Sequence, residues 1–402
     1  MLKRSMQTAG DCSVAAPLAA KTKARAQRLD FVDNLRSAMI ILVVSMHAAV
    51  TYSHVGSWYF MEDPKPGPVV LGIFATYQIF LQAFFMGLLF LLAGYFVPVA
   101  FDRKGARGFM RERLIRLGIP SLVFMLVVQP FTVYWLLRTF ARPTTPSLAT
   151  AYVPYVLSGR FLGSSGPMWF AVALLVFTAV YAGVRLLRRV EPVVQPQPTL
   201  PQHWQVVGLA FLIGTCSFLV RTVQPLGTSI MNMQLCFFSQ YVFLFCVGIF
   251  ARRHDWLGRL AYSFGMRWFR LVYTVGVVLW VVLLVALLKT HTEDRLGGGW
   301  TWQSAAYSYW ESFFCLGCCL GLLVLFREKF NSTGRVQRFL SENSFAVYMF
   351  HTPILIAVTL CLRDYQAPKL IKFAIATVLG VAISYAASSL VFRRVPLLKR
   401  VL

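Results

Sequence analysis

The stretch Asp30-Phe-Val-Asp33-Asn-Leu-Arg36-Ser-Ala-Met-Ile-Ile-Leu-Val-Val-Ser-Met-His47 is a long apolar run that carries two basic side chains. On an α-helix of about 3.6 residues per turn, positions 36 and 47 lie about three full turns apart, so both side chains point the same way. The helical rise separates them by about 16 Å, which places Arg36 near one membrane surface and His47 near mid-depth. Ionisable groups at that depth usually face a polar interior. The pair therefore predicts that functional polar residues lie along one face of this helix.

The rest of the chain has the composition of an integral membrane protein. Of 402 residues, 57% are hydrophobic and only 13% are charged, and the mean hydropathy is +0.63. The apolar residues fall in long runs, which is typical of membrane spans. We expect an all-α polytopic membrane protein with about ten transmembrane helices, the second of which is long enough to be tilted or broken. The expected spans lie near residues 36–53, 69–100, 118–138, 167–187, 205–221, 230–250, 269–288, 304–326, 343–361 and 371–391.

The net charge of +24 is a topology signal. The basic residues are spread through short segments between the apolar runs, so we expect no nucleic-acid partner. With the N-terminus in the cytoplasm, most of the 39 Lys and Arg residues lie on the inner side, which predicts that both termini are cytoplasmic.

One membrane domain preceded by a tail is expected. Residues 1–28 hold no apolar run long enough for a signal-peptide core, and we interpret them as a disordered basic cytoplasmic tail, with a mitochondrial presequence as the alternative. Residues 29–402 form one transmembrane domain, in which the proline-rich segment 192–201 joins two spans on the inner face. All of the eight cysteines except Cys12 lie in apolar spans and fit small core residues, so no metal site is expected.

Several motifs, taken in order, resemble the acyltransferase family 3 membrane proteins. Any one of these blocks is a weak signal, but the ordered set covers nearly the whole chain. The blocks are Arg28 to Arg36 followed by His47, Phe84-Phe85-Met-Gly-Leu-Leu-Phe-Leu-Leu-Ala-Gly94-Tyr95-Phe96, Arg111-Glu-Arg113-Leu-Ile-Arg116, Pro167-Met-Trp169-Phe170, and Ser344-Phe345-Ala-Val-Tyr348-Met-Phe-His351-Thr-Pro353. Within the family, the first 120 residues are similar to a group associated with succinylation of periplasmic glucans.

The resemblance implies an O-acyltransferase in the bacterial inner membrane. It would move an acetyl or succinyl group from cytoplasmic acyl-CoA to a hydroxyl on the far side, usually of a glycan. A thioester is already activated, so the difficult steps are removal of the hydroxyl proton and stabilisation of the negative oxygen. His47 suits the first step as general base. The sequence leaves open the acyl group, the acceptor and the oligomeric state.

The other candidate residues each have a structural alternative. Arg36 could bind the CoA arm, with Asp33 at pairing distance, or be a snorkelling anchor. His351 is a second choice of catalytic base, although its stripe with Phe345 and Tyr348 also fits ordinary packing.

Four basic residues are candidates for binding the CoA phosphates. Arg113 and Arg116 are three residues apart on a helix, so both guanidinium groups could reach one phosphate. Lys104 and Arg107 would extend this basic surface. The alternative is that all four are positive-inside charge.

Acceptor contacts are expected near the outer face. Glu311 could contact a sugar or pair with a neighbouring base, and Trp169 could stack on a sugar ring. Trp58, Trp300 and Trp302 also lie at predicted outer boundaries, where aromatic belts are expected in any case.

A different function class also fits the first helix. A transporter or flippase for an anionic solute or lipid-linked sugar would use Arg36 and His47 as pathway residues. Transporters often contain paired repeats, and the two halves of this chain show no clear self-similarity, which favours the enzyme.

Overall fold

The computed structural model describes residues 29–140, 147–188, 199–391 and 394. The predicted tail 1–28 and most of the predicted linker 192–201 fall outside these ranges. The described residues form an all-α bundle without a β-strand. Its helices are α1 (Asp30–Ser53), α2 (Pro68–Gln82), α3 (Phe85–Arg113), α4 (Ile119–Val123), α5 (Gln129–Phe140), α6 (Leu148–Leu157), α7 (Trp169–Arg188), α8 (His203–Val223), α9 (Phe238–Arg253), α10 (Trp256–Arg259), α11 (Tyr262–Thr290), α12 (Trp302–Lys329), α13 (Arg335–Cys361) and α14 (Lys369–Leu390).

Nine helical runs in the described chain are long and apolar enough to cross a membrane. The expected count was about ten, and the difference lies in the second run, Pro68–Phe140, which contains both predicted spans 69–100 and 118–138. A helix of this length would extend for about 110 Å, far more than the ~30 Å of a bilayer core. It bends instead between α2 and α3 and again at Gly105, whose φ of +67° is left-handed. The fold class is therefore confirmed, and the second predicted span is broken.

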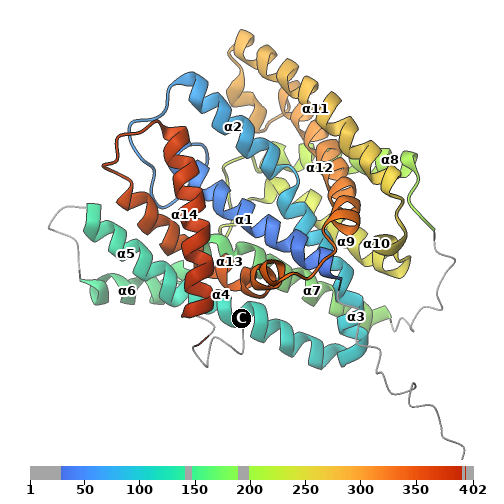
Figure 1. Cartoon of the computed structure of the whole chain (residues 1–402), viewed down its shortest axis with the longest axis horizontal. Helices are drawn as coiled ribbons and strands as arrows, with labels where there is room; N and C mark the ends of the chain where they lie inside the picture. Colours follow the sequence, from blue (N-terminus) through green and yellow to red (C-terminus); the bar gives the residue numbers. More distant parts are fainter. Residues whose placement is uncertain (1–28, 141–146, 189–198, 392–393, 395–402) are drawn as a thin grey trace, which may run out of the picture.

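Helix α1 lies near the centre of the bundle, where it packs against α13, α14, α12 and α2 (Figure 1). Its residues Leu35, Val44 and Ala48 are completely buried. In contrast, α11 carries exposed apolar residues such as Val278 and Val282, as expected for a helix that faces lipid. The central position of α1 surrounds its polar face with other helices rather than with lipid.

Helices α3 and α9 approach each other closely because each contributes a glycine at the crossing. A Cβ atom at Gly94 would collide with the backbone of Phe245, and one at Gly248 would collide with the backbone of Leu91. Small residues of this kind permit close helix packing where apolar burial against lipid gives little driving force. The contact fixes α3, whose first turn forms part of the site described next.

Candidate functional site

Two histidines from opposite parts of the chain meet in the centre of the bundle. His47 projects from α1 and His351 from α13, and the distance between His47 Nδ1 and His351 Nε2 is 3.0 Å. The two rings are nearly parallel, with centroids 5.1 Å apart. His351 is fully buried, whereas His47 is partly accessible. The structure thus joins the first and second choices of catalytic base into one pair.

The backbone around His351 determines which ring nitrogens carry protons. His351 Nδ1 lies 2.9 Å from the carbonyl oxygen of Tyr348 and 3.2 Å from that of Val347. A carbonyl oxygen only accepts hydrogen bonds, so Nδ1 of His351 is the protonated nitrogen and Nε2 of the neutral ring is an acceptor. His47 must then donate its Nδ1–H to His351. Neutral His47 is left with an unprotonated Nε2, which is the atom a general base requires.

Trp58 covers one face of His47, whose ring edge contacts His351. It belongs to the loop between α1 and α2, and its ring stacks on the imidazole with a centroid distance of 4.0 Å and an interplanar angle of 15°. Within the described part of the chain, the buried indole nitrogen of Trp58 has no hydrogen-bond acceptor. The next residue, Tyr59, donates its hydroxyl to Gln129, and burial raises the pKa of Tyr59 so that this phenol stays protonated.

An ion pair fastens this loop to α14. The buried carboxylate of Glu62 lies 2.7 Å from Nζ of Lys372, and the backbone carbonyl of Glu62 accepts a hydrogen bond from Lys369 at 2.5 Å. The backbone amide of Glu62 also donates to the carbonyl oxygen of Thr51 at 2.9 Å. The position of Trp58 over His47 is therefore fixed from two helices.

His47 and Trp58 face a cavity of about 790 Å³. Its wall consists of α1, the loop after α1, the junction of α2 and α3, and parts of α5, α7, α9, α12 and α13. Two further segments, 163–167 and 226–237, complete it. The polar side chains of the wall are His47, Ser57, Trp58, Tyr59, Gln78, Gln82, Gln129, Ser164, Trp169, Asn232, Gln234, Tyr241, Tyr307 and Tyr348. None of the residues that line this cavity in the described chain is Lys, Arg, Asp or Glu.

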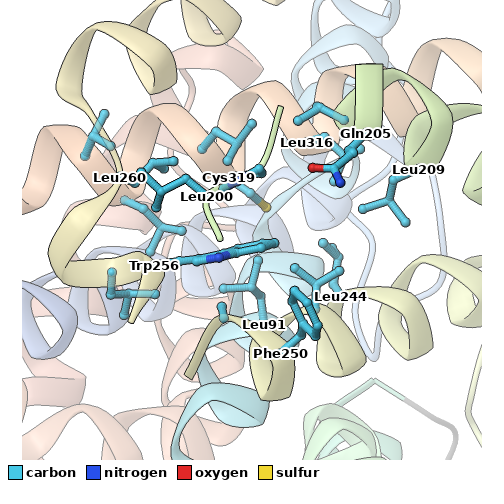
Figure 2. Close-up of a pocket in the computed structure, with 18 of the residues that line it drawn as sticks. Leu91, Leu200, Gln205, Leu209, Leu244, Phe250, Trp256, Leu260, Leu316 and Cys319 are labelled. Carbon is cyan, nitrogen blue, oxygen red and sulfur yellow. The ribbon is translucent and has the colours of Figure 1, made fainter. Parts of the chain in front are cut away.

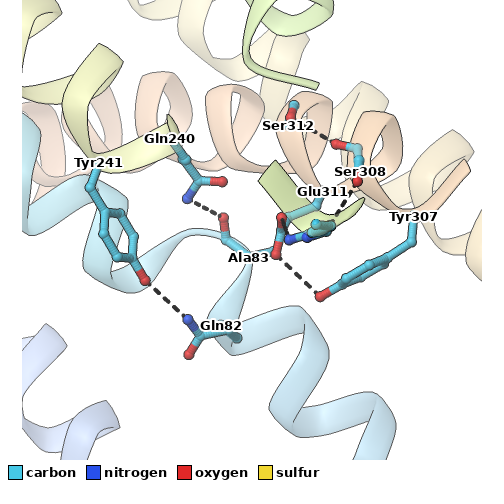
Figure 3. Close-up of polar contacts among 9 residues, drawn as sticks. Gln82, Ala83, Gln240, Tyr241, Tyr307, Ser308, Glu311 and Ser312 are labelled. Carbon is cyan, nitrogen blue, oxygen red and sulfur yellow. Dashed lines mark hydrogen bonds and ion pairs between the residues drawn. The ribbon is translucent and has the colours of Figure 1, made fainter. Parts of the chain in front are cut away.

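The break in the second span supplies part of this wall. Gln82, the last residue of α2, donates from Nε2 to the hydroxyl of Tyr241 at 3.1 Å (Figure 3). The backbone carbonyl of Ala83 lies at the break, and it accepts a hydrogen bond from Gln240 Nε2 at 3.0 Å. A non-helical backbone inside a membrane is tolerated where such partners satisfy it or where it borders a cavity. After the break, Phe85 and Met86 from the first turn of α3 also line the cavity.

Glu311 lies beneath the cavity wall and is paired with a cation. The structure places its carboxylate 2.5 Å from Nη2 of Arg221, with both side chains essentially inaccessible to solvent. The second oxygen of Glu311 accepts a hydrogen bond from the hydroxyl of Tyr307 at 3.1 Å, and Nη1 of Arg221 donates to Ser308 at 2.9 Å (Figure 3). Glu311 was expected either to contact a sugar or to pair with a neighbouring base. It is not among the residues that line the cavity, and the structure shows it paired with Arg221. Trp169, the other expected acceptor contact, does line the cavity.

The basic end of α1 lies outside this cavity. Arg36 is 3.7 Å from Asp33, as their spacing predicts, and its guanidinium lies 4.9 Å from the ring centre of Phe96. Arg113 lies at the same end of the bundle, with its guanidinium 5.1 Å from the ring centre of Phe109. The cavity contacts α1 from Val43 onward and does not include Arg36. Arg36 and His47 therefore share a helix face without sharing this cavity.

The remaining predicted phosphate-binding residues follow α3. Lys104 and Arg116 both form ion pairs with Glu112, and the distance from Arg116 to Glu112 is 3.5 Å. Neither Arg113 nor the exposed Arg107 takes part in these two ion pairs. The structure brings Arg36, Arg113 and Arg116 to one end of the bundle. Lys104 joins this group through Glu112, which it shares with Arg116.

A second, smaller cavity of about 230 Å³ lies between α3, α8, α9 and α12 (Figure 2). Its walls are mostly apolar, with leucine the commonest residue, and the ring of Trp256 lies among them. It contains none of the predicted site residues. Among the described residues, no three His, Cys, Asp or Glu side chains gather closely enough to hold a metal ion.

Several lining residues were not predicted from the sequence. Trp58 was interpreted as part of an aromatic belt, although it lies on the predicted base. Gln78, Gln82 and Gln129 were not singled out either. Their signal was an amide inside an apolar run, where an unpaired polar group is costly and usually faces a polar interior.

Comparisons with known proteins identify relatives of this chain. A family model described as an acyltransferase domain matches residues 29–389. Proteins named glucans biosynthesis protein C from Salmonella heidelberg, Salmonella typhi and Salmonella typhimurium are 24% identical to this chain over 387 residues. Each alignment covers 93% of this chain and 94% of the relative. No solved structure shows significant similarity to the chain.

Proposed function

This chain belongs to the acyltransferase domain family and is a membrane acyltransferase, and from that premise we propose that it transfers an acyl group from cytoplasmic acyl-CoA to a hydroxyl of an extracytoplasmic glycan, with His47 as general base. The observation that carries the proposal is the contact between His47 and His351, from which the tautomer of His47 follows. Its Nδ1–H is held by His351, and it lines the cavity with the unprotonated Nε2 available. The arrangement resembles the logic of a catalytic triad, in which a third group orients the base.

The reaction follows from this geometry. Nε2 of His47 accepts the proton of the acceptor hydroxyl while the hydroxyl oxygen attacks the thioester carbonyl carbon. The carbonyl oxygen carries the negative charge of the tetrahedral intermediate. The carbon–sulfur bond then breaks, and the departing CoA thiolate takes the proton from His47. The products are the ester and free CoA, and His47 returns to its neutral state.

The basic end of α1 is the proposed site for the nucleotide part of acyl-CoA. Arg36 and Arg113 are both cations at this end of the bundle, and a phosphate between them would accept hydrogen bonds from both guanidinium groups. His47 follows Arg36 by eleven positions on α1, which is about 16 Å along the helix axis. The flexible arm of CoA would have to cover this distance along α1 to bring its thioester to His47.

The cavity wall supports a sugar as the acceptor. Amide and phenol groups such as Gln129, Asn232 and Tyr241 hydrogen-bond well to hydroxyls, and Trp58 and Trp169 present flat apolar rings. A site of neutral polar groups and aromatic rings suits an uncharged carbohydrate better than an anionic solute, because it offers no cation for an anion. The same feature disfavours the transport of an anion through this cavity.

The test is acyl transfer by the purified full-length protein in detergent, with radiolabelled acetyl-CoA or succinyl-CoA and a periplasmic glucan as acceptor. His47→Gln removes the base, and we expect a loss of about 10² to 10⁴ in kcat. His291→Asn is the matched control, because His291 is exposed, ends α11 in a left-handed conformation that asparagine tolerates, and lies outside the cavity. Full activity of the His47→Gln variant, with the control also active, would exclude His47 as the base.

A further inference from the structure

The smaller cavity between α3, α8, α9 and α12 extends from the surface of the bundle into its interior (Figure 2). Among its lining residues, Leu200 and Phe250 are 38% and 46% exposed, whereas Leu244 and Leu316 are almost completely buried. Its wall follows α12 from Leu316 to Arg327, which is about 16 Å along the helix axis. This depth is close to half of the ~30 Å hydrocarbon core of a bilayer. The cavity is therefore about as deep as one lipid leaflet.

The buried end of this cavity offers apolar contacts. Leucines such as Leu244 line it, while the strongly polar groups lie toward the other end and have partners within the protein. The indole nitrogen of Trp256 donates to the carbonyl oxygen of Thr199 at 2.7 Å. Arg327 donates to two backbone carbonyl oxygens in and just after α10, at 3.0 and 2.7 Å. Because apolar cavities favour apolar ligands over water, the buried end suits a hydrocarbon chain.

Basic residues lie beside the open end. The segment 250–260 lines the cavity and also carries the exposed Arg252, Arg253 and Arg259, with Asp255 as its one acidic residue. Helices α9 and α12 end and α8 begins at this surface, which the distribution of basic residues predicts to be cytoplasmic. Basic pockets between membrane helices at such a surface bind anionic lipid headgroups, and each basic residue strengthens the binding about fivefold. The charge of this segment therefore favours an anionic headgroup.

We propose that this cavity binds an anionic glycerophospholipid, with one acyl chain inserted between α8, α9 and α12 and its phosphate beside Arg253 and Arg259. The chain fills the space between these helices and adds packing contacts there. The cavity shares no lining residue with the one that contains His47. The inference therefore does not depend on the proposed function.

The experiment uses the purified full-length protein in liposomes with phosphatidylglycerol or phosphatidylcholine that carries a diazirine near the end of one acyl chain. After irradiation, mass spectrometry identifies the labelled residues. We expect phosphatidylglycerol to label Leu244 and Leu316, which lipid around the outside of the bundle does not reach because both are almost completely buried. Labelling by phosphatidylcholine should be about tenfold weaker.

A substitution that fills the cavity tests the insertion of the chain. Val247 lines the cavity, and Val247→Trp should remove most of the label from Leu244 and Leu316. Val242→Trp is the matched control, because Val242 lies on the same helix, is 45% exposed and is not a lining residue. The labelling of this control should match that of the wild type.

A second pair of variants tests the headgroup. Arg253→Gln/Arg259→Gln should remove most of the preference for phosphatidylglycerol. Arg335→Gln/Arg338→Gln should keep this preference, because these two exposed residues begin α13 and do not adjoin the cavity lining.

Each part of the proposal has an outcome that would overturn it. Label confined to exposed residues such as Val242 would exclude the inserted chain, and this result from the wild type requires no variant to fold. Equal labelling of Leu244 and Leu316 by the two lipids would exclude selection of an anionic headgroup. Acyl transfer is measured separately, so neither outcome decides the proposed function.

Discussion

His351 is expected to act through His47, and two substitutions separate this role from simple packing. In His351→Leu the acceptor for the Nδ1–H of His47 disappears, so the base loses the 3.0 Å contact that selects its tautomer. In His351→Gln the side-chain oxygen could accept that N–H while the amide nitrogen donates to the carbonyl oxygen of Tyr348, as the imidazole does at 2.9 Å. The first variant removes the orientation and the second retains it.

The magnitude follows from the hydrogen bonds at stake. A neutral hydrogen bond is worth about 0.5–1.5 kcal/mol net, and a buried donor left without a partner costs about 1–3 kcal/mol. At about 1.36 kcal/mol per tenfold in rate, the loss of orientation corresponds to about 10- to 100-fold in kcat for His351→Leu. We expect His351→Gln to stay within about fivefold of the wild type, since both hydrogen bonds are kept.

The assay is steady-state acyl transfer combined with a double-mutant cycle. If His351 works through the base, the His351→Leu substitution should have almost no further effect in a His47→Gln background. The KM for acyl-CoA should change little in all variants. The reasoning is refuted if His351→Leu keeps wild-type kcat, or if it causes the same fold loss with and without His47.

Three further predictions concern other parts of the site. Arg113→Ala should raise the KM for acyl-CoA about tenfold with little change in kcat, measured by steady-state kinetics; an unchanged KM would reduce this residue to a topology signal. Arg221→Met should lower the free energy of unfolding by about 3–5 kcal/mol, because it leaves the buried carboxylate of Glu311 without its partner. The double variant Arg221→Met/Glu311→Met should lose less stability. Thermal unfolding in detergent measures both losses, and equal losses in the two variants would contradict the prediction. Glu62→Gln should lower kcat about tenfold, because it releases the loop that holds Trp58 over His47. Adding Lys372→Met to this variant should restore part of the lost kcat. A wild-type kcat in Glu62→Gln would show that the loop is fixed without the ion pair between Glu62 and Lys372.

The sequence predicts the fold well because the bilayer imposes strong rules. Apolar runs long enough to span a membrane are expected to be helical, and their positions follow directly from the apolar runs in the sequence. The count of spans was less certain because helix ends and bends depend on contacts between helices. The break after Gln82 is an example, since Gln240, which satisfies the freed carbonyl of Ala83, lies 157 positions from it along the chain.

The candidate site could be predicted only in part. Helical spacing and the resemblance to a family pointed to His47, Arg36 and His351. Neither predicts that the two histidines touch, because that contact joins residues 304 positions apart. The loop with Trp58 has no periodic pattern, so its fold over the base depends on the distant contact between Glu62 and Lys372.

The apolar layer of α1 between Arg36 and Val43 has a consequence for the energy supply of the cell. A pathway that joined the two compartments would leak protons and dissipate the gradient that drives ATP synthesis. Met39 and Ile40 are buried and lie on α1 between its basic end and the cavity. An acyl group on the proposed route along α1 would have to displace these side chains in each catalytic cycle, and their return afterwards would keep the proton gradient intact.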